Sequence, residues 1–180
     1  MKNRLALLTL LLSITANADE LTTNEQYIKI IKSAKDYANS ISCPGIEISK
    51  ESVILLNPQK AEKYYNDALY AVLWDGDIGC RGGSATENTN ISLIAPSVGD
   101  TFVVLPSISS PAIKFNIPVR YVSEIVSHTN NTLTLTGMKY GPHDPNSAPS
   151  IPDLFTVKID KNGNWNLISE KETPSVSSQQ

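Results

Sequence analysis

Hydrophobic residues between positions 27 and 41 recur every three or four residues, which is the spacing of one face of an α-helix. Thr22 and Glu25 stand at the spacing of a capping box just before this pattern, so they predict where the helix begins. The helix is expected to end before Cys43 and Pro44, because a residue that precedes proline avoids helical geometry. The apolar face consists of Tyr27, Ile30, Ile31, Ala34, Ala38 and Ile41.

A second, shorter helix is predicted to begin at Asn57 and Pro58. Asparagine is a favoured N-cap residue, and proline suits the first helical position because no N–H is needed there. We expect this helix to run through residues 61–65. From residue 68 the pattern changes, and residues 68–74 are apolar on both faces, which is typical of a strand covered on both sides.

Turn-forming residues divide the rest of the chain into short segments with a strand pattern. Two of the breaks, at residues 128–131 and 160–163, have the asparagine, aspartate and glycine content of hairpin turns. Residues 132–136 alternate threonine with leucine, which predicts one apolar face and one solvent-facing face. The predicted strands are 90–95, 101–105, 112–115, 119–127, 132–138, 154–160 and 165–169.

Helices followed by hairpin-linked strands predict an α+β fold. We expect one amphipathic N-terminal helix and a shorter second helix packed on one face of a mostly antiparallel sheet of about six to eight strands. Three segments are expected along the chain: a signal peptide at 1–18, a single α+β domain at 19–169 and a polar, disordered tail at 170–180.

Residues 1–18 have the pattern of a cleavable export signal. Lys2 and Arg4 precede an apolar run at 5–14, and residues 16–18 form a small-x-small cleavage site. The apolar run is too short to span a bilayer. We therefore expect a protein of the periplasm or the external medium; the alternative is a short buried first helix.

Loss of the signal would take the net charge from −3 to −5 and leave Arg81 and Arg120 as the arginines. A mildly acidic chain without a basic cluster argues against nucleic acid or an anionic membrane as the main partner. No later apolar run reaches the length of a membrane span, so no transmembrane anchor is expected after cleavage.

Cys43 and Cys80 are the two cysteines of the chain. In an oxidising compartment a single disulfide between them is expected, and it would fasten the end of the first helix to the loop after residues 68–74. The alternative is that one cysteine serves as a catalytic thiolate.

Residues 74–84 form the densest unusual segment, with four glycines, Asp75, Asp77 and Arg81. Such a loop can bring bare backbone close to a ligand, and Arg81 could bind a carboxylate through two hydrogen bonds. In the alternative, this is a disulfide-anchored turn in which Arg81 pairs with Asp75 or Asp77. The segment lacks the sixth-position glycine of an EF-hand and the G-K-[ST] of a P-loop, which argues against calcium and phosphate.

Residues 140–152 form a second unusual segment, with four prolines between two predicted strands. A stiff loop of this kind is either a recognition edge or a cover for one end of a sheet, and His143 and Asp144 are its candidate contacts. A hydrolytic pair of Ser84 and His143 is a weaker alternative, because Ser84 lacks the second glycine of a nucleophile elbow. Two histidines and an oxidised cysteine pair are too few for a zinc site, so no metal or cofactor is expected.

The two loops together resemble a group of small exported bacterial proteins of unassigned function. The pattern runs W-x-G-D-x-G-C-x-G-G-S from Trp74 to Ser84 and Y-G-x-x-D-x-N-x-x-P-S from Tyr140 to Ser150. In that group the positions of Ser147 and Ala148 are often two cysteines, so this chain lacks a second bridge. The resemblance implies a periplasmic or secreted protein and brings no activity, cofactor or catalytic residue with it.

These features favour an exported binding protein of the inhibitor or immunity type in the bacterial cell envelope. Its partner would be another envelope or secreted protein. A small cell-wall or glycan hydrolase and a structural envelope component are the alternatives. The candidate contacts are Asp75, Asp77, Arg81, Ser84, His143 and Asp144.

Overall fold

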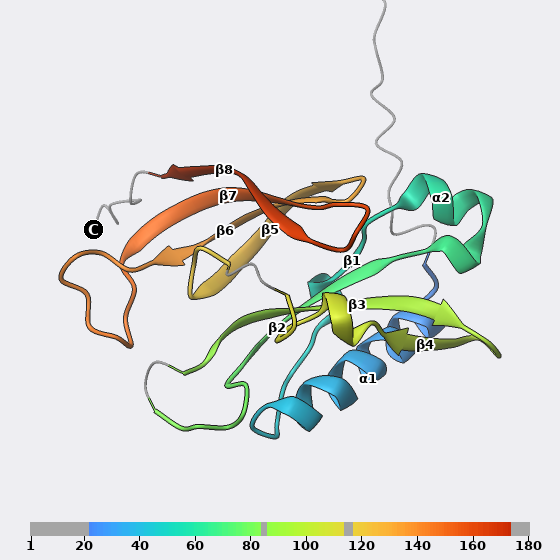
Figure 1. Ribbon diagram of the computed structural model, residues 1–180, viewed down its shortest axis with the longest axis horizontal. Helices are drawn as coiled ribbons and strands as arrows, with labels where there is room; N and C mark the ends of the chain where they lie inside the picture. Colours follow the sequence, from blue (N-terminus) through green and yellow to red (C-terminus); the bar gives the residue numbers. More distant parts are fainter. Residues whose placement is uncertain (1–21, 84–85, 114–116, 174–180) are drawn as a thin grey trace, which may run out of the picture.

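One long helix and two antiparallel sheets are stacked as three layers, with the first sheet in the middle (Figure 1). The computed structural model describes residues 22–83, 86–113 and 117–173. The elements are α1 (Asn24–Ile41), β1 (Val53–Leu55), α2 (Pro58–Lys63), β2 (Tyr70–Gly76), β3 (Asn88–Ser97), β4 (Thr101–Val104), β5 (Tyr121–Thr129), β6 (Thr132–Lys139), β7 (Ile151–Ile159) and β8 (Trp165–Glu172). The predicted signal peptide at 1–18 lies outside the described residues.

The predicted first helix is confirmed as α1, and its start is set by a different capping box. The Thr23 hydroxyl accepts a hydrogen bond from the Gln26 N–H, and the Gln26 side chain accepts one from the Thr23 N–H. The prediction was one residue early because Thr22 is buried, with its hydroxyl 3.2 Å from that of Tyr70. The face that α1 buries against the first sheet contains Tyr27, Ile30 and Ala34.

The first sheet has the order β1-β2-β3-β4 and is buried on both faces. Alternate residues of its strands therefore belong to two separate hydrophobic clusters. This confirms a strand covered on both sides in the predicted region, although β2 begins at Tyr70 and ends at Gly76 instead of covering 68–74. The face toward α1 presents Val53, Leu55, Tyr70, Val72, Ile94 and Phe102. The opposite face presents Ile54, Leu56, Ala71, Leu73, Ile91 and Leu93 to the second sheet.

The second sheet has the order β5-β6-β7-β8, in which each strand pairs with its neighbour in sequence. Both predicted hairpins are confirmed: Asn131 adopts a left-handed φ of 60° between β5 and β6, and Asp160 accepts backbone hydrogen bonds from Asn162 and Asn164 between β7 and β8. The inner face packs on the first sheet, and the outer face of β6 is lined by half-buried threonines. The inner residues are Leu133, Leu135, Phe155, Val157, Ile159 and Trp165.

The expectation that the helices pack on one sheet of six to eight strands is wrong, because the strands divide into two sheets of four. β4 pairs only with residues 94–97 of β3, and beside the earlier part of β3 side chains take the place of a further strand. The Ser109 and Ser110 hydroxyls accept hydrogen bonds from the backbone N–H groups of Leu93 and Ile91. Because these N–H groups already have acceptors, no further strand is needed beside this part of β3, and the chain continues into the second sheet.

Three smaller predictions also change. Residues 112 and 113 form no strand, and residues 114 and 115 of that predicted strand lie outside the described part of the chain. β8 continues to Glu172, so residues 170–172 belong to a strand and not to a tail. The second helix begins at Pro58 as predicted but ends at Lys63, before a separate turn at Tyr65–Asp67.

Within residues 22–83, 86–113 and 117–173, no helix combines the length and the apolar character needed to cross a membrane.

The face-to-face packing of the two sheets predicts a difference between two leucines of the second sheet. Leu135 is fully buried between the sheets, whereas Leu167 on β8 is 40% exposed. Leu135→Ala should lower the free energy of unfolding by about 2–5 kcal/mol, because it leaves a cavity in the core. Leu167→Ala should cost less than about 1 kcal/mol. Denaturant unfolding measures both, and equal losses would contradict this packing.

Candidate functional site

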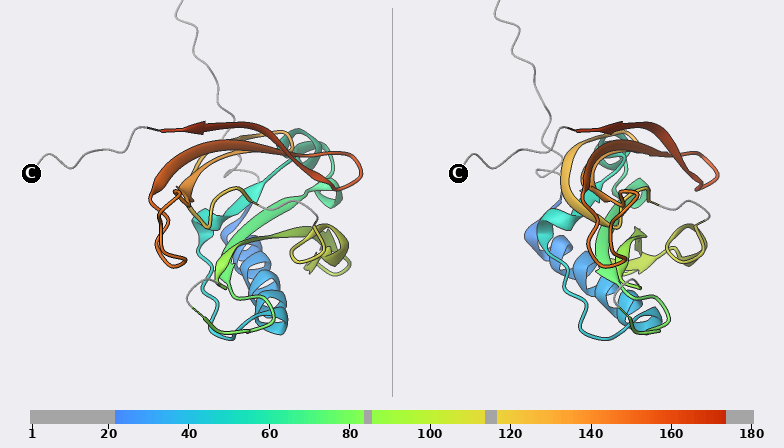
Figure 2. Two further views of the ribbon diagram at one scale, coloured as in Figure 1. Left: turned by 60° about the vertical axis from the view of Figure 1, so that its left-hand side comes forward. Right: turned by 90° about the vertical axis from the view of Figure 1, so that its left-hand side faces the viewer.

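Two loops stand out in the sequence, and their described residues, 77–83 with 86–87 and 140–150, lie at the same end of the molecule (Figure 1, Figure 2). The first connects β2 to β3, and the second connects β6 to β7. One side chain joins them. Arg120 donates from Nε to the Glu87 carbonyl at 3.1 Å, and from Nη1 to the Tyr140 hydroxyl at 2.9 Å and to the Asn146 carbonyl.

Arg120 also connects the two sheets through its backbone. Its N–H donates to the Met138 carbonyl on β6, and its carbonyl accepts from the Thr89 N–H on β3. The side chain is only 5% exposed, and the guanidinium lies 4.8 Å from the centre of the Tyr121 ring. A buried guanidinium needs acceptors in fixed positions, so the contacts of Arg120 hold both loops in one arrangement.

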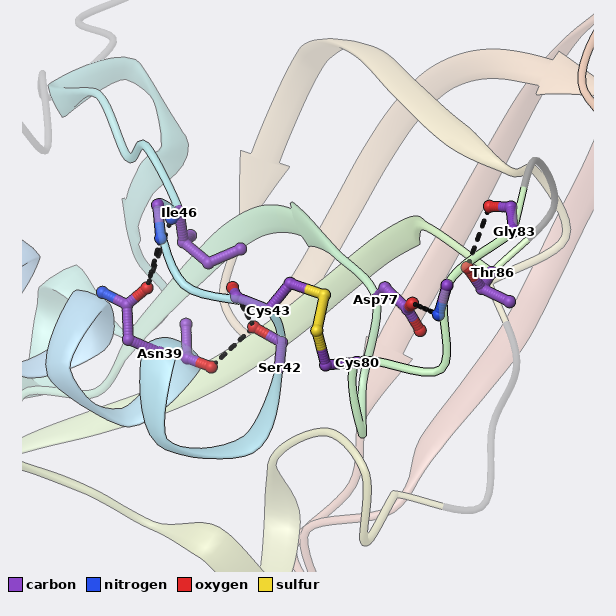
Figure 3. The surroundings of a disulfide bond; sticks show 11 residues. Asn39, Ser42, Cys43, Ile46, Asp77, Cys80, Gly83 and Thr86 are labelled. Carbon is purple, nitrogen blue, oxygen red and sulfur yellow. Dashed lines mark hydrogen bonds between the residues drawn. A yellow bond between two sulfur atoms is a disulfide. The ribbon is translucent and has the colours of Figure 1, made fainter.

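The predicted disulfide is confirmed and joins Cys43, just after α1, to Cys80 in the first loop (Figure 3). Backbone hydrogen bonds reinforce this connection. The Gly79 N–H donates to the Ile41 carbonyl at 2.7 Å, and the Cys43 N–H donates to the Asp77 carbonyl at 3.2 Å. The bridge therefore fastens the end of the helix to the loop, as predicted.

Asp75 connects β2 to β3 beside the first loop, and Asp77 serves the internal structure of the loop. The Asp75 carboxylate accepts a hydrogen bond from the Thr89 hydroxyl, and Asp77 accepts one from the Gly82 N–H at 2.8 Å. Burial by itself would raise the pKa of Asp77, but hydrogen bonds from Gly82 and Thr86 and the charge of Arg81 outweigh it and hold the pKa below its usual value. Neither aspartate forms a salt bridge with Arg81, which is exposed.

Asp144 closes the second loop across its base. Its carboxylate accepts hydrogen bonds from the Gly141 N–H, the Ser150 N–H and the Ser150 hydroxyl, each at 2.7 Å. These hydrogen bonds lower the pKa of Asp144, and the bond from Gly141 has the largest effect. The charge of His143 acts in the same direction. His143 itself is exposed to solvent.

A charged cluster that the sequence analysis missed lies where the second loop begins. Lys139 Nζ lies 2.8 Å from Glu170, 3.1 Å from Glu172 and 3.6 Å from Asp153, and these carboxylates raise its pKa. Asp153 is fully buried, and burial raises its pKa as well. The sequence contained a signal for this cluster. Alternate residues of β7 face inward, and Asp153 is two positions before the inward residue Phe155, so a buried carboxylate could have been predicted.

The six predicted contact residues thus have three different outcomes. Arg81 and His143 are exposed on the two loops. Asp75, Asp77 and Asp144 are engaged in hydrogen bonds within or beside their own loops. Ser84 lies outside the described residues, so its pairing with His143 stays a prediction.

Comparison with known proteins gives no relative, because no family model, no curated protein and no solved structure matches this chain. The chemistry available at this end of the molecule therefore comes from its own residues. It presents constrained backbone, an exposed guanidinium at Arg81, an exposed imidazole at His143 and the partly exposed ring of Tyr140. These groups suit recognition by hydrogen bonds and by contact with a complementary surface.

The role of Arg120 predicts a contrast between the two arginines. Arg120→Met should lower the free energy of unfolding by about 3 kcal/mol, because it leaves buried acceptors without a donor. It should also speed amide hydrogen exchange throughout residues 140–150. Arg81→Met removes an exposed guanidinium and should cost less than about 0.5 kcal/mol, with no change of exchange in that loop. Equal effects would mean that Arg120 does not hold the loops.

The two shifted carboxyl groups predict opposite contributions to the pH dependence of stability. The lowered pKa of Asp144 means that its contribution is present above the unfolded pKa of about 3.9 and is lost as pH falls through the folded value. The raised pKa of Asp153 means that its contribution is present below the unfolded value and is lost as pH rises through the folded value.

Unfolding free energies measured from about pH 2 to pH 7 will separate these two contributions. Asp144→Asn should reduce the gain of stability with rising pH, whereas Asp153→Asn should increase that gain. Parallel pH profiles for the two variants would contradict both assignments.

Proposed function

We propose that this chain is an exported binding protein of the bacterial cell envelope, of the inhibitor or immunity type. Residues 77–83, 86–87 and 140–150 form its contact surface, which we name the loop face. The observation that carries the proposal is the set of hydrogen bonds from Arg120 to Glu87, Tyr140 and Asn146. They make one surface out of two loops that are separated along the chain.

The rigidity of the loop face supports a binding role. A loop that is ordered before its partner arrives loses less conformational entropy on association. The first loop is held by the disulfide and by Asp77, and the second is held by Asp144. Arginine and tyrosine are frequent among residues that dominate binding energy, and Arg81 and Tyr140 are partly or fully accessible here.

Export is supported by two independent features. A disulfide is typical of proteins that leave the reducing cytosol, and the bridge between Cys43 and Cys80 is formed. The pattern of residues 1–18 is that of a secretory signal. An envelope location brings the loop face into contact with secreted enzymes and with other envelope proteins, which are the expected partners.

The test uses the mature protein as bait in envelope extract and as an additive in assays of cell-wall hydrolases. A partner should be recovered in stoichiometric amount, and a double variant Arg81→Ala and His143→Ala should weaken that complex by at least about tenfold. The matched control is Lys158→Ala with His128→Ala, which removes a cation and a histidine from the second sheet.

Two results would contradict the proposal. One is the absence of any stoichiometric partner together with no effect on hydrolase activity. The other is an equal loss of binding in the two double variants, because it would show that the partner does not recognise the loop face.

A further inference from the structure

Two adjoining hollows beside the first loop form a groove with chemistry of its own. Their volumes are about 430 and 420 Å³. The first hollow is lined by Ile113, Ile117 and Val119, and the second reaches Arg81. The residues common to both hollows are Ile78, Asn88, Asn90 and Pro111.

One end of this groove carries a positive charge available to a ligand. Arg81 forms no salt bridge within the described part of the chain. The Asp77 carboxylate lines the same hollow and interacts with the charge of Arg81, but it forms no salt bridge with the guanidinium and accepts a hydrogen bond from Gly82 at 2.8 Å. A guanidinium in this position is suited to two parallel hydrogen bonds with a carboxylate.

The middle of the groove offers hydrogen-bond acceptors. Asn90 is only 7% exposed, and its Nδ2 donates to the carbonyls of Gly76 and Asn88. With Nδ2 engaged in this way, Oδ1 of Asn90 accepts no hydrogen bond from the residues that the structure describes, and Asn90 lines both hollows. Oδ1 of Asn90 is not among the fully buried atoms that lack a partner, so it is an acceptor open to the groove and suits a ligand that supplies an N–H.

The other end of the groove is apolar, with the side chains of Ile113, Ile117 and Val119, and Pro111 extends this surface into the middle. The order along the groove is therefore a cation, an amide acceptor and an aliphatic surface. The terminal residues of a peptide carry the complementary groups, namely a carboxylate, an amide N–H and an apolar side chain. An isolated anion would leave the acceptor and the aliphatic surface unused.

We propose that this groove binds the carboxyl terminus of a peptide that ends in an aliphatic residue. Arg81 binds the terminal carboxylate, Asn90 accepts a peptide N–H, and the aliphatic side chain lies against Pro111 and Ile113. The proposal rests on the proposed function, since Arg81 belongs to the loop face, and it specifies which part of a partner that region recognises.

The test is calorimetric titration of the mature protein with N-acetyl-alanyl-leucine and with the same peptide as its C-terminal amide. The acid should bind at least about tenfold more tightly than the amide, because the charge-assisted hydrogen bonds to Arg81 are lost with the amide. Arg81→Gln should remove most of that preference. The control is Lys158→Gln on β7, which also removes one positive charge but at a residue that does not line the groove. This variant should retain the preference for the acid peptide.

Amide chemical shifts provide a readout that needs no variant to fold. Addition of the acid peptide to the wild-type protein should shift the side-chain amide resonances of Asn88 and Asn90. Equal affinity for acid and amide, undiminished preference in Arg81→Gln, shifts confined to other regions, or no binding at millimolar peptide would each overturn the proposal. If the peptide proposal fails in one of these ways but the loop face still captures a partner, the proposed function remains valid.

Discussion

Arg120 connects the two sheets through its backbone and the two unusual loops through its side chain. Arg120 is 5% exposed, and a buried guanidinium is stable only when rigid acceptors surround it; here these acceptors belong to Glu87, Tyr140 and Asn146. The loops therefore cannot rearrange independently of the sheets. The packing of the core and the shape of the loop face are consequences of the same set of contacts.

The middle layer explains why this end of the molecule is built from both sheets. β2 and β3 are buried on both faces, by α1 on one side and by the second sheet on the other (Figure 2). Ser109 and Ser110 close the edge of β3 with their hydroxyls and so separate the layers. Each sheet then contributes one loop, and the groove beside Arg81 lies where the first loop meets residues 110–113, on the way from the first sheet to the second.

The distribution of charge follows from the same architecture. Carboxylates in the loops lie close to backbone N–H groups, which stabilise the charged form, as at Asp77 and Asp144. Asp153 lies on the inner face of β7, where burial disfavours its charge and Lys139 is the nearby cation. The exposed charges left for a partner are fewer than the composition indicates, and Arg81 is the exposed cation that lines the groove beside the first loop.

The sequence alone determined α1, the burial of residues 68–74 on both faces, the two hairpins and the disulfide. These features depend on local periodicity, on turn residues and on a count of two cysteines, all of which are visible along the chain. It did not determine the division into two sheets, because alternation shows which face of a strand is buried and not which strand pairs with it. Nor did it reveal Arg120, whose partners include backbone carbonyls that every residue possesses. Only the folded chain decided which of these carbonyls would meet a buried guanidinium.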